Sequence, residues 1–327
     1  MSVWDSLVGQ KPVIDMLSRI AQGDPSQITQ SWLICGPPGS GRSNMARAFA
    51  AALESPDHGM SAEPTRVTQQ VLAGTHPDVT VLTTNKVTIG IDQVREIITT
   101  SEQMPATAPW RIIIIEDVDR MLERTTNVLL KEIEEPAEHC IWLLCAPSAQ
   151  DVLPTIRSRC RPVYMPRLPE ETIRQELLSR GQTPERAAYA ARLSEGVLGR
   201  AIALCGQDPY YRCRDEAVAL LRALREKADI PKASLAWEER RKPEDSLPFL
   251  EAMEAVLRDI VRVQSGLAPF DAQIESELEE FARHFTIEGV ACIMEEVVTV
   301  RKRVHAHVQW RSAAEPLLRR IVEGAEK

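Results

Sequence analysis

A strand pattern, a glycine-rich loop and a helical pattern follow one another directly, and this succession constrains the fold most. Five mostly apolar residues, Ser31–Cys35, precede the loop, and apolar residues recur at helical spacing from Met45 to Ala50 after it. A phosphate-binding loop requires strand, glycine loop and helix in this order. A glycine-rich turn without a ligand is the alternative, which this context disfavours. We therefore predict an α/β P-loop domain with a parallel sheet.

The loop matches the pattern G-x-x-x-x-G-K-[ST] at every fixed position but one. Gly36, Gly41 and Ser43 fill their positions, Gly39 lies between them, and Arg42 stands where the pattern has lysine. In such loops backbone N–H groups surround phosphate oxygens, the lysine reaches the β/γ-phosphates and the hydroxyl holds Mg²⁺. Arginine keeps the charge but replaces a compact ammonium with a wide planar fork. These five residues are candidates for binding ATP or ADP, with Mg²⁺ only alongside nucleotide.

A second apolar run, Arg111–Ile115, ends in two acids, Glu116 and Asp117. A continuous β-branched run is typical of the centre of a parallel sheet. Ligands bind at the carboxyl edge of such sheets, so both acids should lie beside the phosphate loop. Carboxylates in this place hold Mg²⁺ and polarise the attacking water. Exposed acids at a strand end are the alternative, and the pairing with the loop disfavours it.

The remaining patterns divide the chain into three parts. We predict a P-loop core over 1–166, a small helical domain over 167–208 and an all-α domain over 209–327. Further predicted elements are strands at Val79–Leu82 and Cys140–Cys145, helices at 91–104 and Thr125–Glu135, an irregular insert at 55–70 and a solvated linker at 226–245.

Composition excludes several classes of protein. Seven cysteines are scattered and form no C-x-x-C pair, which suits reduced thiols in a cytoplasm and predicts neither a disulfide framework nor a metal site. No apolar run reaches membrane-spanning length, and the N-terminus lacks signal-peptide character. The net charge of −8 argues against strong nucleic-acid binding by the chain alone. We expect a cytoplasmic protein without a membrane partner.

Five segments together resemble the AAA+ clamp-loader family of bacterial DNA polymerase III. The two most specific are the Leu-Leu-Lys-x-x-Glu-Glu-Pro stretch in Asn127–Pro136 and the Ser-Arg-Cys tripeptide that ends Leu153–Cys160. The other three are Gly36–Ser43, Thr75–Asp78 and Ile112–Arg120, and weaker similarity extends to Val304–Gln309 and Glu315–Leu318.

The resemblance implies a five-membered ring with each nucleotide at a subunit boundary. Arg159, in the Ser-Arg-Cys motif, would be an arginine finger acting in trans on a neighbour's ATP. Such a guanidinium stabilises charge on the transferred phosphoryl group, by roughly 10³–10⁵ in rate in other NTPases. The implied partners are the gamma/tau and delta subunits, the sliding clamp and, through the complex, primed DNA. Without the family pattern, pairing of Arg157 or Arg159 with surface acids would be the default interpretation.

The chain departs from the hydrolysing members of this family at four places. Arg42 replaces the lysine, and Glu116-Asp117 reverses the usual aspartate–glutamate order. Ala146–Ser148 replace the threonines that sense the γ-phosphate. Gly199 stands where the lid arginine belongs, and Arg200, one position on, is rotated by about 100° on a helix. We therefore expect no useful hydrolysis, whereas the sequence leaves nucleotide binding open because the glycines, the hydroxyl and a cation remain.

The zinc module of the family is also missing. It uses four cysteines between the first helix and the His-Pro-Asp segment, but no cysteine lies between Cys35 and Cys140. His58 and His76 cannot complete a tetrahedral site by themselves. We therefore predict no zinc.

The resemblance favours an interaction and regulatory subunit of the loader over an enzyme. An ATP-hydrolysing motor subunit, gamma/tau-like, or a related AAA+ ATPase is the alternative. A P-loop kinase is disfavoured, because no second substrate-binding constellation follows the loop and the helical C-terminal part would have no role in it.

Overall fold

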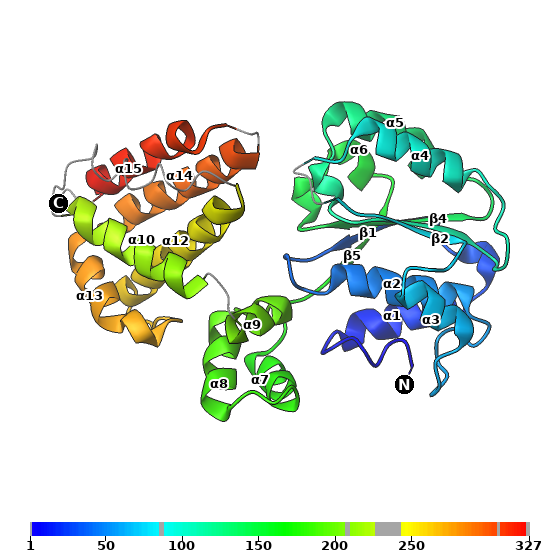
Figure 1. The fold of residues 1–327 in the computed structure, drawn as a ribbon, viewed down its shortest axis with the longest axis horizontal. Coiled ribbons are helices and arrows are strands. Elements are labelled where there is room, and N and C mark those ends of the chain that lie inside the picture. The colour runs from blue at the N-terminus through cyan, green and yellow to red at the C-terminus, as the bar shows by residue number, and fades with distance from the viewer. Residues whose placement is uncertain (1, 85–87, 207–209, 226–242, 306–307, 325–327) are drawn as a thin grey trace. The chain divides into compact units, whose positions relative to one another are not determined.

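The chain forms two compact units, Met1–Ile202 and Ala203–Lys327, and each is described by itself. The computed structural model describes residues 2–84, 88–206, 210–225, 243–305 and 308–324 (Figure 1). Among these residues, no helix combines the length and the apolar character needed to cross a lipid bilayer.

The first unit is an α/β core followed by short helices. Its strands are β1 Ser31–Cys35, β2 Val79–Leu82, β3 Arg111–Ile115, β4 Cys140–Ala146 and β5 Arg161–Tyr164. Its helices are α1 Lys11–Ala21, α2 Arg42–Glu54, α3 Arg66–Leu72, α4 Ile91–Ser101, α5 Glu123–Glu134, α6 Pro154–Arg157, α7 Glu170–Ser179, α8 Pro184–Leu193 and α9 Leu198–Cys205, and the boundary between the units falls inside α9.

The five strands form one parallel sheet in the order β2-β3-β4-β1-β5. The innermost strands β1, β3 and β4 are buried along their whole length, which explains their continuous apolar sequences. The glycine loop follows β1 and the two acids follow β3, so both lie at the carboxyl edge of the sheet. This is the AAA+ P-loop fold that the sequence predicted.

Helices cover both faces of the sheet, with α1, α2 and α3 on one side and α4, α5 and α6 on the other (Figure 1). Successive residues of β1 alternate between the two cores: Trp32 packs edge-on against Phe49 of α2 at 5.3 Å, whereas Leu33 joins the cluster that contains Leu129 of α5. The sheet thus holds α2 and α5 in fixed positions on its two faces.

Two predicted local features differ from the structure. The insert expected to be irregular over 55–70 ends in helix α3, which begins after Thr65 because the Thr65 hydroxyl accepts a hydrogen bond from the Thr68 N–H. Strand β5 was not anticipated, because only Val163 of its four residues is buried and it has no apolar pattern. The predicted linker over 226–245 lies outside the described residues as far as residue 242.

The second unit is all-helical, as predicted. Its described helices are α10 Tyr210–Arg225, α12 Pro243–Gln264, α13 Glu275–His284, α14 Ile287–His305 and α15 Trp310–Gly324. The apolar face of α12 is buried within this unit, and so is that of α14 from Ile293 to Val304, whereas Val308 beyond it is 41% exposed.

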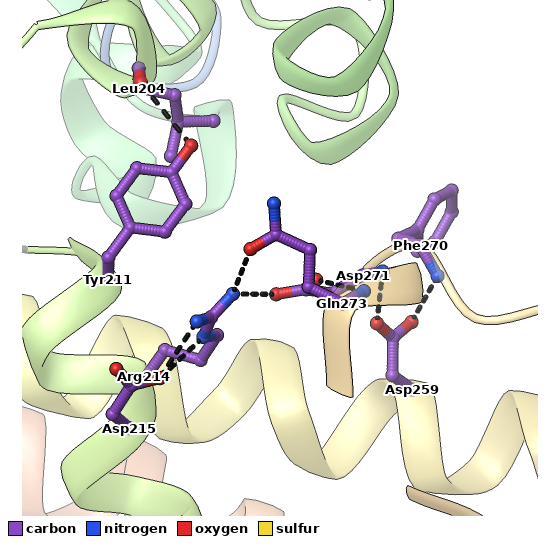
Figure 2. Close-up of polar contacts among 8 residues, drawn as sticks. All are labelled: Leu204, Tyr211, Arg214, Asp215, Asp259, Phe270, Asp271 and Gln273. Atoms are coloured by element: carbon purple, nitrogen blue, oxygen red, sulfur yellow. Dashed lines mark hydrogen bonds and ion pairs between the residues drawn. The ribbon is translucent and has the colours of Figure 1, made fainter. Parts of the chain in front are cut away.

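A polar cluster fixes the connection between α12 and α13 in the second unit (Figure 2). Arg214 of α10 donates hydrogen bonds to Asp271 Oδ2 at 3.0 Å and to Gln273 Oε1 at 3.1 Å. Asp259 of α12 accepts from the backbone N–H groups of Phe270 and Asp271, both at 2.9 Å. The loop between the helices is therefore bound by buried charged groups of two helices.

The His-Pro-Asp segment has a structural role at the amino edge of the sheet. Asp78 accepts hydrogen bonds from the Ala106 N–H at 2.6 Å and from the Thr107 N–H and hydroxyl at 2.8 Å. Arg111 lies 3.3 Å from Asp78 and also donates to the Pro77 carbonyl at 2.8 Å. Burial alone would raise the pKa of Asp78, but these hydrogen bonds hold it below its ordinary value. Asp78 therefore binds the loop that leads into β3.

Glu54, the last residue of α2, is buried near this cluster. Its Oε2 atom accepts a long hydrogen bond of 3.4 Å from the Trp110 N–H, and its Oε1 atom has no partner in the described part of the chain. Burial, reinforced by the charge of Asp78, raises the pKa of Glu54 to about 8. The carboxyl group is therefore largely protonated in the folded protein at neutral pH.

The pKa of Glu54 predicts a loss of stability with rising pH. Because the folded state binds this proton more tightly than the unfolded state, the stabilisation is complete below the unfolded pKa of about 4.5 and is lost as the pH rises through about 8. We expect the free energy of unfolding to fall by on the order of 5 kcal/mol over this range. Glu54→Gln should remove this pH dependence in denaturant titrations, and the exposed control Glu102→Gln should keep it. An unchanged slope in Glu54→Gln would contradict the assignment.

Candidate functional site

The glycine loop at the carboxyl edge of β1 has a backbone that only glycine adopts easily. Gly39 and Gly41 have φ of 83° and 89°, in the left-handed region, and Gly41 immediately precedes α2. A Cβ atom on Gly36 would lie 2.5 Å from Ser40 Oγ and 2.8 Å from Met165 Cβ. All three glycines of the sequence motif are therefore required by the shape of the loop itself.

The Arg42 side chain is committed to its own chain. Nη1 donates a 2.6 Å hydrogen bond to the carbonyl oxygen of Gly36, and Nη2 donates to Asp117 Oδ1, with which it forms an ion pair. The residue is only 8% exposed. A planar guanidinium can bind these two acceptors at once, which favours arginine over lysine here. Arg42 thus ties the loop to the end of β3.

Both predicted acids are paired with arginines. Asp117, which has a left-handed φ of 54°, also lies 3.2 Å from Arg120. Glu116 accepts a 2.7 Å hydrogen bond from Arg47, one and a half turns along α2 from Arg42. The structure therefore brings the loop and the acids together as predicted, but their charges are balanced inside the chain. A bound Mg²⁺ would have to compete with these cations for the carboxylates.

Two hydroxyl groups near the loop differ in availability. Ser43 makes no side-chain hydrogen bond to any described residue. Ser148, after β4, accepts the N–H of Gln150 at 3.2 Å and so caps a short 3₁₀ helix, Ala149–Asp151. The Ser43 hydroxyl is therefore free for an external ligand, and the buried Ser40 hydroxyl of the loop also has no hydrogen-bond partner among the described residues, whereas Ser148 caps a helix.

The first turn of α9 lies directly on the glycine loop. The Gly199 N–H donates a 2.9 Å hydrogen bond to the Gly39 carbonyl, and a Cβ atom built on Gly199 would lie 2.7 Å from Gly39 Cα. Arg200 forms an ion pair with Glu195 at 2.8 Å. Glycine at 199 is therefore required for the close packing of two backbones. The sequence analysis interpreted this position only as the loss of an arginine.

Arg159 lies at the opposite edge of the sheet from the loop. It precedes β5, whose first residue pairs with Trp32 near the start of β1, whereas the loop begins after Cys35. Four residues of strand span about 13 Å, and β5 runs parallel to β1. Arg159 therefore lies at the amino edge of the sheet, about one strand length from the phosphate loop of its own chain.

The neighbours of Arg159 hold it in place. Arg159 Nε donates to Glu134 Oε2 at 2.8 Å, and Nη1 donates to the Thr155 carbonyl at 2.9 Å. The next residue, Cys160, is 7% exposed and belongs to the core beneath α5, and burial raises the pKa of its thiol to about 12. The Ser-Arg-Cys motif thus combines the buried Cys160, which packs in the core, with the partly exposed guanidinium of Arg159.

Comparison with known proteins identifies the family. The family described as "DNA polymerase III, delta subunit" matches residues 9–169. The chain is similar to DNA polymerase III delta-prime subunits of three bacteria. It is 31% identical to the Pseudomonas aeruginosa protein over 50% of this chain and 51% of that protein, and 27% identical to the Escherichia coli protein over 83% of this chain and 82% of that protein. The Bacillus subtilis protein is 22% identical over 96% of this chain and 97% of that protein. Together these similarities support membership of the clamp-loader delta-prime family.

The first of these alignments spans about half the length of the Pseudomonas protein. Gamma/tau subunits of DNA polymerase III match as well: the Mycobacterium bovis protein is 32% identical over 51% of this chain, which is 29% of that protein. Similarity to delta-prime proteins covers up to 96% of this chain, so the gamma/tau alternative has no better support.

No metal-binding group of three or more His, Cys, Asp or Glu side chains occurs within the described ranges. His58 lies in a turn with a left-handed φ of 52°, beside Gly59, whose carbonyl accepts the Val3 N–H at 3.1 Å. The turn that follows α2 is therefore held by a hydrogen bond from the N-terminal segment.

Sequence reasoning missed three residues of these sites. Arg47, Arg120 and Glu134 each pair with a predicted site residue. Glu134 is part of the Leu-Leu-Lys-x-x-Glu-Glu-Pro stretch, so its motif was recognised but its partner was not. Arg47 and Arg120 stand in ordinary helical or turn patterns and gave no signal of their own.

The contact between Gly199 and Gly39 predicts that Gly199→Ala destabilises the first unit. The added Cβ would force the two backbones apart, at a cost of about 1–3 kcal/mol in the free energy of unfolding. The control is Gly90→Ala, because a Cβ there meets nothing closer than 3.6 Å. Denaturant titration of both variants measures the difference, and equal stability of the two would contradict the packing argument.

Proposed function

We propose that the chain is the delta-prime-like subunit of a DNA polymerase III clamp loader. In this role it is a stator that donates the Arg159 guanidinium in trans to ATP held by a neighbouring subunit. The loader would then place the sliding clamp on primed DNA. The observation that carries the proposal is the location of Arg159 at the edge of the sheet opposite its own loop.

The neutralised acids argue against hydrolysis by this chain. Hydrolysis needs one carboxylate free to hold Mg²⁺ and another free to polarise water, at positions kept within fractions of an ångström. Here Glu116 pairs with Arg47, and Asp117 pairs with Arg42 and Arg120. We infer that the ATPase activity of the chain alone is weak or absent.

The Arg42 pairing also argues against tight nucleotide binding. A phosphate entering the loop would have to displace the guanidinium from Gly36 and Asp117 or share it with them. We propose that this loop binds ATP or ADP, with Mg²⁺, only weakly.

Partners and organisation follow from family membership. We propose gamma/tau and delta subunits as ring neighbours, the clamp and primed DNA as partners of the whole complex, and the cytoplasm as its location. We also propose the division into a core over 1–166, a lid over 167–208 and a collar over 209–327. The buried faces of α12 and α14 support a collar with a stable core of its own.

The isolated chain should therefore neither hydrolyse ATP nor bind it well. We expect a Kd for Mg²⁺–ATP weaker than about 1 mM and no multiple turnovers, measured by calorimetry and by phosphate release. The motor alternative predicts the reverse. Repeated turnover by the chain alone, abolished by Ser43→Ala, would show that it is a motor subunit.

Arg159→Ala should slow hydrolysis at one neighbouring site of the assembled loader. We expect the hydrolysis rate at that site to fall roughly 10³-fold or more. The steady-state ATPase rate of the loader should then fall by the fraction that this site contributes to it, while nucleotide binding is nearly unchanged. Arg157→Ala is the matched control, because Arg157 is exposed and lies two residues away. Unchanged ATPase in the Arg159→Ala loader would overturn the finger assignment.

A further inference from the structure

We propose that Glu134 is a positioning residue for the arginine finger. It orients the Arg159 guanidinium toward the neighbouring subunit without touching the nucleotide itself. The inference rests on the proposed function, since it assigns a role within the same trans-acting site.

The hydrogen bonds of Arg159 leave one nitrogen available. Nε donates to Glu134 Oε2 at 2.8 Å, and Nη1 donates to the Thr155 carbonyl at 2.9 Å and to Ser158 Oγ at 3.5 Å. Nη2 has no partner among the residues that the structure describes. The guanidinium is therefore held at two of its three nitrogens, and Nη2 is left for a ligand outside the chain.

Both ends of the Glu134–Arg159 pair are anchored in the sheet. Glu134 ends α5, where the Ser31 hydroxyl of β1 donates a 2.9 Å hydrogen bond to the carbonyl of Ile133. Arg159 is followed by the buried Cys160 and then by β5, which pairs with β1. The carboxylate and the guanidinium thus start from backbone positions that the same strand fixes.

The exposure of this pair favours a role in positioning over a role in stability. The side chains of Arg159 and Glu134 are 31% and 55% exposed. Solvent-exposed ion pairs contribute little to folding, because water screens the charges and the side chains lose rotamer freedom. Prior ordering of a long, rotamer-rich side chain instead favours its engagement with a phosphate, since less freedom is lost at that step.

The test uses the assembled loader. Glu134→Ala should lower kcat at the neighbouring site by roughly three- to tenfold, the size expected when a positioned group loses its orientation, while KM for ATP stays the same. Glu134→Gln keeps an acceptor for the Nε–H and should restore most of the rate. Glu135→Ala is the matched control, because Glu135 is the next exposed acid and makes no ion pair among the described residues.

A double-mutant cycle decides whether Glu134 acts through Arg159. In a loader that already carries Arg159→Ala, Glu134→Ala should have no further effect on kcat. Provided that Arg159→Ala alone slows hydrolysis, three results would overturn the positioning role. Glu134→Ala could lower kcat equally in the Arg159→Ala background, or the loader that carries Glu134→Ala alone could have an unchanged or a faster rate. If Arg159→Ala itself has no effect, the proposed function fails instead. Size-exclusion chromatography of each loader confirms assembly, and Glu134→Gln carries the cycle if Glu134→Ala does not assemble.

Discussion

The buried guanidinium of Arg42 is the interaction on which the arrangement of the carboxyl edge depends. It joins the Gly36 carbonyl, at the end of β1, to Asp117, at the end of β3, although β4 separates these strands in the sheet. A single ammonium group would bind both acceptors less readily than a planar fork does. The same substitution that removes the usual phosphate ligand therefore supplies a bond between two distant parts of the sheet.

A loop held in this way also accommodates the lid. Because Arg42 fixes the loop from within, the start of α9 can lie against it, and the backbones of Gly39 and Gly199 approach to hydrogen-bond distance. A nucleotide-dependent motor needs these elements to move with each turnover. Here the loop, the end of β3 and the start of α9 are joined by bonds within the chain.

The sheet and the composition of the site were largely predictable from the sequence, but the directions of its side chains were not. Uniformly apolar runs identified β1, β3 and β4, and the motif identified Gly36, Gly39, Gly41 and Ser43. Arg47 was missed, because its partner Glu116 lies 69 residues away and nothing local marks the pair. Gly199 was interpreted as a lost arginine, since one sequence cannot show that a neighbouring backbone excludes every side chain.

Helix α5 links the two edges of the sheet physically. Its 12 residues extend over about 18 Å, from just after the turn that contains Arg120 to Glu134 beside Arg159. The turn is held by the ion pair of Arg120 with Asp117, and the far end of the helix is held by Ser31. The orientation of Arg159 is therefore set by bonds within this chain, to the Glu134 carboxylate and the Thr155 carbonyl.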